Sequence, residues 1–245
     1  KSLSRWMPME KWDFCSESPD IEALKGRACY GGLDLSSTLD LSGFLLVFPP
    51  DTEDGIWDVL VKAYCPEEGI IKRSKVDRVR YDIWGKQGFL TATPGEVIDY
   101  GWIKKDVYEA AQLYDLREVG YDPWNATQTA TEIMAELNPS GSDHGFQMVE
   151  MKQRVQTYNE PMKNVLGHIA RKVVRHGGHP LLRWCADNLV VKIDANGNIY
   201  PNKEKATEKI DLMTAMFMAW GRAMLKTETA SCYEKRGVLT FGTGG

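Results

Sequence analysis

The stretch Ala28-Cys29-Tyr30-Gly31-Gly32-Leu33-Asp34-Leu35 decides the fold, because it predicts a buried strand that carries a carboxylate near its end. Its two adjacent glycines weaken a strand intrinsically, so they indicate that another backbone or a ligand approaches closely. Apolar runs at 43–48 and 55–64 follow after short turns and predict two further strands. Three strands joined in this way form an antiparallel meander.

The rest of the chain predicts an alternation of helices and strands. Helical spacing or charge patterning predicts helices over 72–86, around 103–114, over 126–137, from 159 onward and over 209–225. Short apolar runs predict strands over 118–122 and 146–150, and residues 188–200 predict a hairpin with its turn at 194–198. This order is typical of a single α/β domain with a mixed sheet.

Length and composition exclude several classes of protein. The 245 residues are 43% hydrophobic and 26% charged, which excludes a disordered tail, a collagen-like repeat and a small disulfide-rich toxin. Five cysteines without a CxxC pair predict reduced, buried thiols, and no apolar run is long enough to predict a membrane span. The net charge of -4 argues against DNA binding, because nucleic-acid binders usually carry a basic excess.

Three aspartates lie where a charged side chain is unexpected. Asp34 lies late in an apolar strand, Asp122 ends another, and Asp211 lies in the first turn of an apolar helix. An ionised carboxylate among apolar neighbours is costly unless it is paired, hydrogen-bonded or bound to metal. If the strands of Asp34 and Asp122 are adjacent and parallel, their ends converge, and the last helix can place Asp211 at the same rim.

Such a group of carboxylates predicts a site for divalent cations. An oxygen-only ligand set favours Mg²⁺ or Mn²⁺ over zinc. Two such ions about 4 Å apart can activate a water and stabilise the leaving oxygen in phosphodiester cleavage. Asp40, in the adjoining turn, is a candidate fourth carboxylate. Each residue also has a structural alternative: Asp122 as a strand-end or turn residue, Asp40 as a turn residue, and Asp211 as a favourable charge at a helix N-terminus.

Other candidates have weaker support. His176 and His179 flank two glycines, without a further ligand at zinc spacing, so a metal role is disfavoured. The basic cluster Arg171, Lys172, Arg175 and His176 fits a solvated helix end slightly better than a phosphate contact. The stripe Met213, Phe217, Trp220 and Met224 is typical of a core-facing helix. Lys203, Lys205 and Lys209 precede Asp211, and contact with DNA phosphates or plain surface exposure both fit them.

Several motifs, in order, resemble one known family. They are Gly32-Leu33-Asp34-Leu35-Ser36, Gly120-Tyr121-Asp122-Pro123, the run from Gly178 to Lys203, and Lys209-Ile210-Asp211-Leu212-Met213-Thr214-Ala215. Together they resemble the nuclease domain of tailed-phage terminase large subunits, with similarity from about residue 5 to residue 225. Asp34, Asp122 and Asp211 match the family's three acidic positions, and Asp40 matches a further position in part of the family.

The resemblance implies an RNase H-like fold, with three antiparallel strands followed by parallel strands and with helices on both sides. It implies an endonuclease that uses two Mg²⁺ or Mn²⁺ ions to cut concatemeric double-stranded DNA during packaging, with low sequence specificity. The implied partners are a packaging ATPase domain, a small terminase subunit and the portal, in the cytoplasm of the infected host. A junction resolvase or recombinase of the same fold, or a non-catalytic docking module stabilised by metal, remains an alternative.

The resemblance also gives expected domain boundaries. The chain has no G-x-x-x-x-G-K-[S/T] phosphate loop, so we expect it to lack the ATPase domain. Residues 1–26 are then a lead-in segment that follows that domain, 27–230 the nuclease domain, and 231–245 a C-terminal tail.

Overall fold

The computed structural model describes residues 4–36, 40–52, 54–76, 79–202 and 209–235. Within these residues the main sheet has seven strands, in the order β5-β4-β3-β2-β6-β7, with β8 beside β4. Their bounds are β2 Ala28–Asp34, β3 Ser42–Phe48, β4 Trp57–Pro66, β5 Thr91–Thr93, β6 Asp115–Tyr121, β7 Gln147–Glu150 and β8 Val174–Arg175.

The predicted mixed sheet is confirmed. Strands β2, β3 and β4 form the antiparallel meander, whereas β6 pairs in parallel with β2 and β7 in parallel with β6. Strand β3 is buried along its whole length, and β2 is buried from Cys29 onward. Burial on both faces explains why these strands are continuous apolar runs rather than alternating ones.

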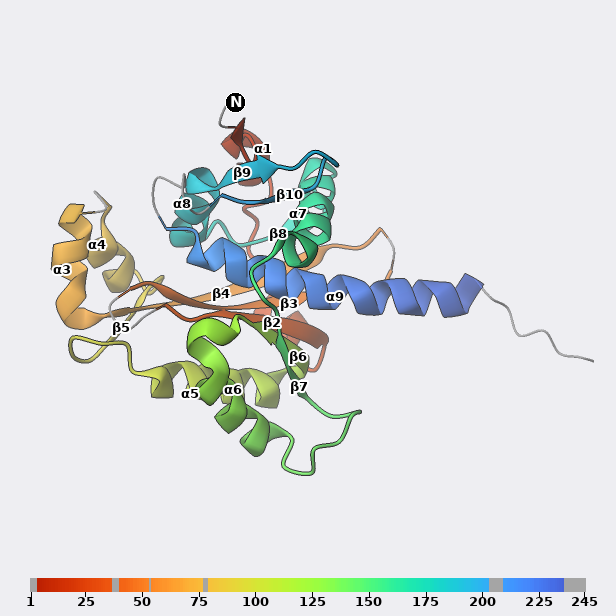
Figure 1. Cartoon of the computed structure of the whole chain (residues 1–245), viewed down its shortest axis with the longest axis horizontal. Helices are drawn as coiled ribbons and strands as arrows, with labels where there is room; N and C mark the ends of the chain where they lie inside the picture. Colours follow the sequence, from red (N-terminus) through yellow and green to blue (C-terminus); the bar gives the residue numbers. More distant parts are fainter. Residues whose placement is uncertain (1–3, 37–39, 53, 77–78, 203–208, 236–245) are drawn as a thin grey trace, which may run out of the picture.

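Helices cover both faces of the sheet (Figure 1). One face packs against α5 (Tyr100–Leu113) and α6 (Pro123–Leu137), with Ile103, Val107 and Ile133 buried between the layers. The other face packs against α9 (Asp211–Lys235), which itself lies beneath α7 (Val155–Ala170) and α8 (Pro180–Asn188). The predicted stripe of Met213, Phe217, Trp220 and Met224 on α9 is buried in this second core.

Glycines let α9 approach the sheet closely. Gly32 of β2 lies opposite Gly120 of the parallel strand β6, and both face α9. A Cβ atom at Gly32 would lie 1.8 Å from the carbonyl oxygen of Ala215, so only glycine fits there. The close backbone approach predicted from the paired glycines is therefore confirmed, and the approaching backbone is the last helix.

The N-terminal segment is part of the fold. Strand β1 (Ser4–Arg5) pairs with β9 (Val190–Ile193), which pairs with β10 (Ile199–Pro201) in a small antiparallel sheet. This sheet contains the predicted hairpin. Helices α1 (Met9–Asp13) and α2 (Ile21–Leu24) follow β1. Trp6 and Trp12 are buried in the core around α9, which the absence of a clear period in residues 1–26 did not predict.

The segment predicted to be helical over 72–86 begins earlier and contains two helices. These are α3 (Glu67–Val76) and α4 (Tyr81–Lys86), beyond the β4–β5 end of the sheet (Figure 1). The four cysteines whose side chains the structure describes, Cys15, Cys29, Cys65 and Cys185, are buried, as predicted, and no disulfide joins them. None of the helices in the described ranges is long and apolar enough to cross a membrane.

Candidate active site

Asp34 and Asp122 lie side by side because their strands are parallel neighbours. Leu33 pairs with Tyr121 in the register of β2 and β6, and each aspartate is the next residue in the chain: Asp34 ends β2, and Asp122 follows the end of β6. The carboxyl ends of parallel strands share one edge of a sheet, so both side chains reach the same rim. Asp34 is 5% exposed, and its Oδ2 accepts a hydrogen bond from Thr214 Oγ1 on α9.

Asp122 also begins α6. Its side chain accepts a hydrogen bond from the backbone N–H of Trp124 (3.2 Å), and Pro123 occupies the first helical position. Aspartate followed by proline is a favourable helix start, because the carboxylate satisfies a free N–H and proline has none to satisfy. Asp122 therefore follows the end of β6 and caps α6 rather than forming a turn, and the same geometry holds its carboxylate at the rim.

Asp211 is the first residue of α9 and approaches the rim from the other side. Its Oδ2 is buried and has no hydrogen-bond partner in the described part of the chain. Burial raises the pKa of Asp211 to about 7, with the charges of Asp34 and Asp40 contributing and the ammonium of Lys209 opposing the shift. A buried oxygen without a hydrogen-bond partner destabilises the fold, so a ligand that binds Oδ2 of Asp211 would stabilise it.

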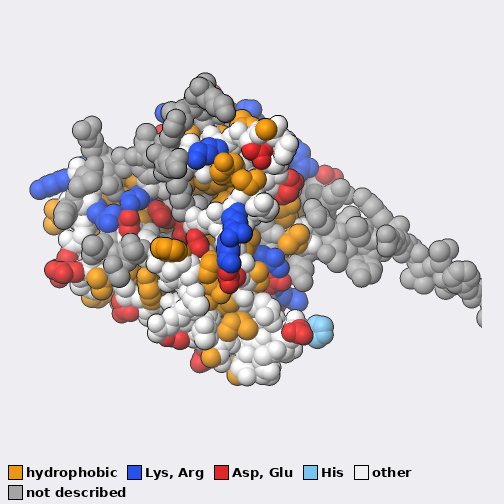
Figure 2. Space-filling view, in the orientation of Figure 1, with side chains coloured by type: hydrophobic (Ala, Val, Ile, Leu, Met, Phe, Trp, Pro, Cys, Tyr) orange, Lys and Arg blue, Asp and Glu red, His pale blue; other side chains and the backbone are white. Residues whose placement is uncertain are grey.

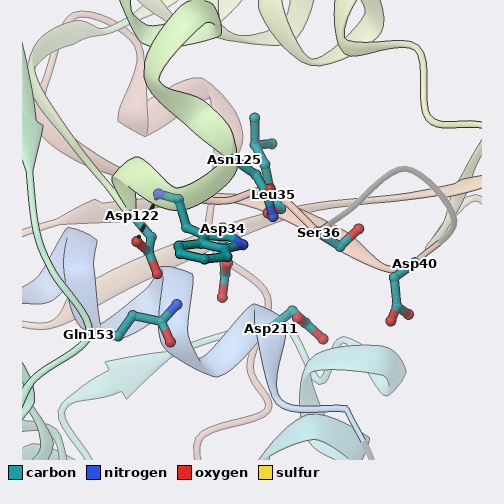
Figure 3. A pocket seen from close by; sticks show the side chains of 9 residues that line it. Asp34, Leu35, Ser36, Asp40, Asp122, Asn125, Gln153 and Asp211 are labelled. Carbon is teal, nitrogen blue, oxygen red and sulfur yellow. Dashed lines mark hydrogen bonds between the residues drawn. The ribbon is translucent and has the colours of Figure 1, made fainter.

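These residues line one pocket of about 460 Å³, together with Leu35, Ser36, Asp40, Trp124, Asn125 and Gln153. In Figure 3 the carboxylate of Asp34 lies between Asp122 and Asp211, and Gln153 points toward them from the segment after β7. Asp40 lies at the far end of the pocket. The structure thus brings the three predicted aspartates together.

Asp40 differs from the other three because basic side chains hold it. Its carboxylate forms ion pairs with Arg73 of α3 and with Lys209, and its Oδ1 also accepts from the backbone N–H of Leu41. Lys209, predicted as a candidate phosphate contact, therefore forms an ion pair with Asp40 in this structure. Lys203 and Lys205 lie outside the described residues.

The donor set fits hard divalent cations. Carboxylate oxygens dominate the polar side chains of the pocket, and the unpartnered Oδ2 of Asp211 faces no donor that would satisfy it. Among the residues that the structure describes, however, no three His, Cys, Asp or Glu side chains are close enough to surround one ion. The carboxylates share a pocket but would have to draw closer around bound metal.

The two histidines considered for metal binding have structural roles. His176 is buried, stacks on Trp12 at 4.3 Å between ring centroids, and its Nε2 lies 2.9 Å from the carbonyl oxygen of Trp12. His179 caps α8 by accepting from the backbone N–H of Leu182. Burial lowers the pKa of both imidazoles, to about 4 for His179.

The basic cluster at 171–176 is not a free charged surface. Arg175 forms a bidentate pair with the fully buried Asp58, at 2.7 and 3.0 Å, and Arg27 contacts the same carboxylate. Lys172 lies over the ring of Phe14, 4.3 Å from its centroid. The sequence predicted a solvated helix end or a phosphate contact for Arg175, and this prediction was wrong. Arg175 pairs with Asp58, which lies 117 residues away in the chain, so local sequence could not indicate the pair.

Sequence reasoning missed the other polar residues of the pocket. Asn125 donates from Nδ2 to the carbonyl oxygen of Leu35 (3.1 Å) and so ties the start of α6 to the end of β2. Gln153 reaches the site from a segment without regular structure, so its sequence carries no signal. Trp124 is the exception: a tryptophan directly after Asp-Pro, at a helix start, could have been noticed.

With this geometry in place, comparison with known proteins identifies the family. The model of the family "Terminase large subunit, endonuclease domain" matches residues 2–227. The chain belongs to this family. The large subunit of the terminase of Enterobacteria phage HK97 is 36% identical over 225 residues, which cover 91% of this chain and 42% of that protein.

Solved structures agree with this assignment. The crystal structure of the HK97 large terminase matches with a TM-score of 0.77 and 32% identity, over 90% of this chain and 44% of that one. A large terminase nuclease from the thermophilic phage G20c, solved with bound cobalt, matches with a TM-score of 0.51 and 12% identity, over 87% of this chain and 96% of that one. The chain is a terminase nuclease domain with an RNase H-like fold, and it spans less than half the length of its HK97 relative.

Proposed function

We propose that this domain is a metal-dependent endonuclease that cleaves double-stranded DNA, with Asp34, Asp122 and Asp211 as the metal-holding carboxylates. The observation that carries the proposal is the meeting of these three side chains in one pocket, with a buried oxygen of Asp211 left unpartnered. The G20c nuclease, a relative in fold, was solved with cobalt, another divalent ion. For this chain we propose two ions, Mg²⁺ or Mn²⁺.

Each carboxylate has a distinct structural support in this proposal. Thr214 holds Asp34, the start of α6 holds Asp122, and the start of α9 places Asp211 opposite them. When bound, the ions would supply the Lewis acidity that activates a water and stabilises the leaving oxygen. Asp40 would assist after its release from Arg73 and Lys209, both of which would then be available to phosphate oxygens.

We propose that the domain cuts DNA with low sequence specificity, and the charge distribution indicates that this chain binds DNA weakly on its own. On the face seen in Figure 2, acidic and basic side chains are mixed, and those that the structure describes form no broad basic stripe. A protein surface of this kind holds DNA weakly unless metal or another domain contributes. In the complete protein we propose that a packaging ATPase domain, a small terminase subunit and the portal contribute, in the cytoplasm of the infected host.

Plasmid cleavage tests the proposal. Supercoiled plasmid incubated with the 245-residue chain and Mn²⁺ should become nicked and linear, and EDTA should abolish the reaction. Asp34→Asn and Asp211→Asn should each reduce the rate at least about a hundredfold, because each removes a charged ligand. Asp143→Asn, an exposed aspartate outside the pocket, is the matched control and should cleave like the wild type.

Three outcomes would change the assignment. Unchanged cleavage by Asp34→Asn or Asp211→Asn would remove these residues from the mechanism. Preferential cleavage of four-way junctions over linear duplex would favour a resolvase. Metal that raises the melting temperature without any cleavage would favour a docking module stabilised by metal.

A further inference from the structure

Trp124 is the most exposed tryptophan among the residues that the structure describes. Its exposed fraction is 88%, whereas that of Trp102, the other tryptophan with an exposed side chain, is 41%. The remaining tryptophans are buried or packed against the core: Trp6, Trp12, Trp57, Trp84, Trp184 and Trp220. Single exposed apolar side chains are common on protein surfaces, so the exposure of Trp124 gains meaning only from the place where it lies.

The backbone of Trp124 is fixed although its side chain is not packed. Its backbone N–H donates to the carboxylate of Asp122. Pro123, the residue directly before it, has a fixed backbone φ angle that suits the first position of α6. Asn125 anchors the next position to the carbonyl oxygen of Leu35. Among the described residues no aromatic ring packs on the indole and no cation lies over it. The indole is therefore held at a defined place and left available.

The indole of Trp124 lies in the pocket of the three aspartates. Trp124 lines the same pocket as Asp34, Asp122 and Asp211, and it is two residues from Asp122 in the chain. Any DNA whose phosphate reaches these carboxylates must bring its neighbouring sugar and base to the rim where the indole lies. In a duplex the base faces are stacked on one another, so the indole would pack against the apolar carbon atoms of the neighbouring deoxyribose, which are the same for every base.

We propose that Trp124 is a substrate-contact residue whose indole packs against the nucleoside beside the phosphate held at the aspartates. This inference rests on the proposed nuclease function and adds a determinant of substrate positioning to it. The aspartates and their ions bind the charged phosphate, and Trp124 binds its apolar neighbour. Because the contact is independent of sequence, it suits an enzyme that cuts DNA with little base preference.

Kinetics and binding with matched variants test the proposal. Trp124→Ala should raise the KM for a linear duplex in Mn²⁺ about tenfold and weaken binding by a similar factor, the order of loss expected when one large apolar side-chain contact is removed. Trp124→Phe should remain within about threefold of the wild type, because it keeps a flat ring. Trp102→Ala, on α5 and outside the pocket, is the control and should match the wild type in both assays. All three variants should melt like the wild type.

Binding is measured by fluorescence anisotropy in an Asp34→Asn background, so that it does not depend on cleavage. If Trp124→Ala has the KM and the affinity of the wild type, or if it lowers the melting temperature enough to explain its effect, the inference is overturned while cleavage by the wild type still supports the nuclease. If the wild type does not cleave DNA, the nuclease proposal fails, and the anisotropy comparison still decides the role of Trp124. A chain that neither cleaves nor binds DNA overturns both.

Discussion

At the scale of single residues, Asp211 is a carboxylate whose ionised form is unfavourable in this fold. Its Oδ2 is buried without a partner, and the nearby Asp34 and Asp40 raise its pKa further. Lys209 opposes this effect, but it is paired with Asp40. The metal-free site is thus destabilised by the same arrangement that would bind a divalent cation tightly.

This arrangement predicts how stability depends on pH in EDTA. The pKa of Asp211 is about 7 in the fold and near 4 in the unfolded chain, so the folded state binds the proton more tightly. As pH rises from 4 to 7 the unfolded chain loses this proton first, and the wild type loses stability relative to Asp211→Asn. Above pH 7 the difference should level off, at about 2–4 kcal/mol in favour of the variant.

Urea unfolding of both proteins at several pH values measures this difference. Comparison of the two proteins removes the contributions of the buried histidines, which are common to both. Addition of Mn²⁺ at pH 8 should reverse the order, because only the wild type retains the full set of charged ligands. A difference that does not depend on pH would show that Asp211 is not protonated in the metal-free fold.

At the scale of the elements, the glycines of β2 and β6 determine where α9 lies. Gly32 and Gly120 are opposite each other, and their missing side chains leave room for the backbone of the helix. This close approach puts Thr214 within hydrogen-bonding reach of Asp34. Gly32 and Gly120, each two residues before its aspartate, are therefore packing requirements of the site.

Gly32→Ala should consequently destabilise the fold by about 3 kcal/mol or more, since its Cβ would meet backbone atoms of Ala215 and Ala219 that cannot move aside cheaply. Chemical denaturation measures the loss. Gly167→Ala in α7 is the matched control: its Cβ would meet nothing within 4 Å, and alanine should stabilise that helix by about 0.5–1 kcal/mol. Equal effects at the two positions would contradict the close contact.

At the scale of the whole molecule, the N-terminal segment completes the core. Trp6 packs edge-on against Phe217 of α9 at 5.2 Å between ring centroids, and its backbone N–H donates to the carbonyl oxygen of Leu189. It also contacts Trp12 of α1. Residues that precede the predicted nuclease domain thus cover the helix that carries Asp211.

Trp6→Ala should therefore cost about 3–5 kcal/mol of folding free energy, as for other large buried aromatic residues. Phe14→Ala, in the same segment but with an exposed fraction of 66%, should cost less than about 1 kcal/mol. Thermal melting of the two variants measures the contrast. A small effect of Trp6→Ala would mean that the segment is only loosely attached.

The net charge of -4 is also understood at this scale. Part of the acidic excess is concentrated at one pocket rather than spread over the surface as counter-charge. Divalent ions bound there would change the sign of the local field, which a sum over the sequence cannot register. Bulk composition thus gives little information on whether this chain binds DNA.

The sequence by itself determined the longer strands of the main sheet, most of the longer helices and the three aspartates, but not the strands β1, β5 and β8 or helix α8. Continuous apolar runs, helical periodicity and a charge among apolar neighbours are local signals, and they sufficed for β2, β3, β6, α6, α9 and the hairpin. The sequence also indicated, through Gly31 and Gly32, that a backbone would approach β2 closely. These features depend on neighbouring residues, so they are visible along the chain.

Only the tertiary structure decided which charges meet. Arg175 forms an ion pair with Asp58, and Lys209 and Arg73 form ion pairs with Asp40. Gln153 and Trp124 line the pocket of the aspartates from separate segments of the chain. The energy of such pairs depends on distance and burial in three dimensions, and nothing in their local sequence encodes it. For the same reason the sequence could indicate three carboxylates for a metal site, whereas the exposed indole beside them and the unpartnered oxygen of Asp211 became apparent only in the fold.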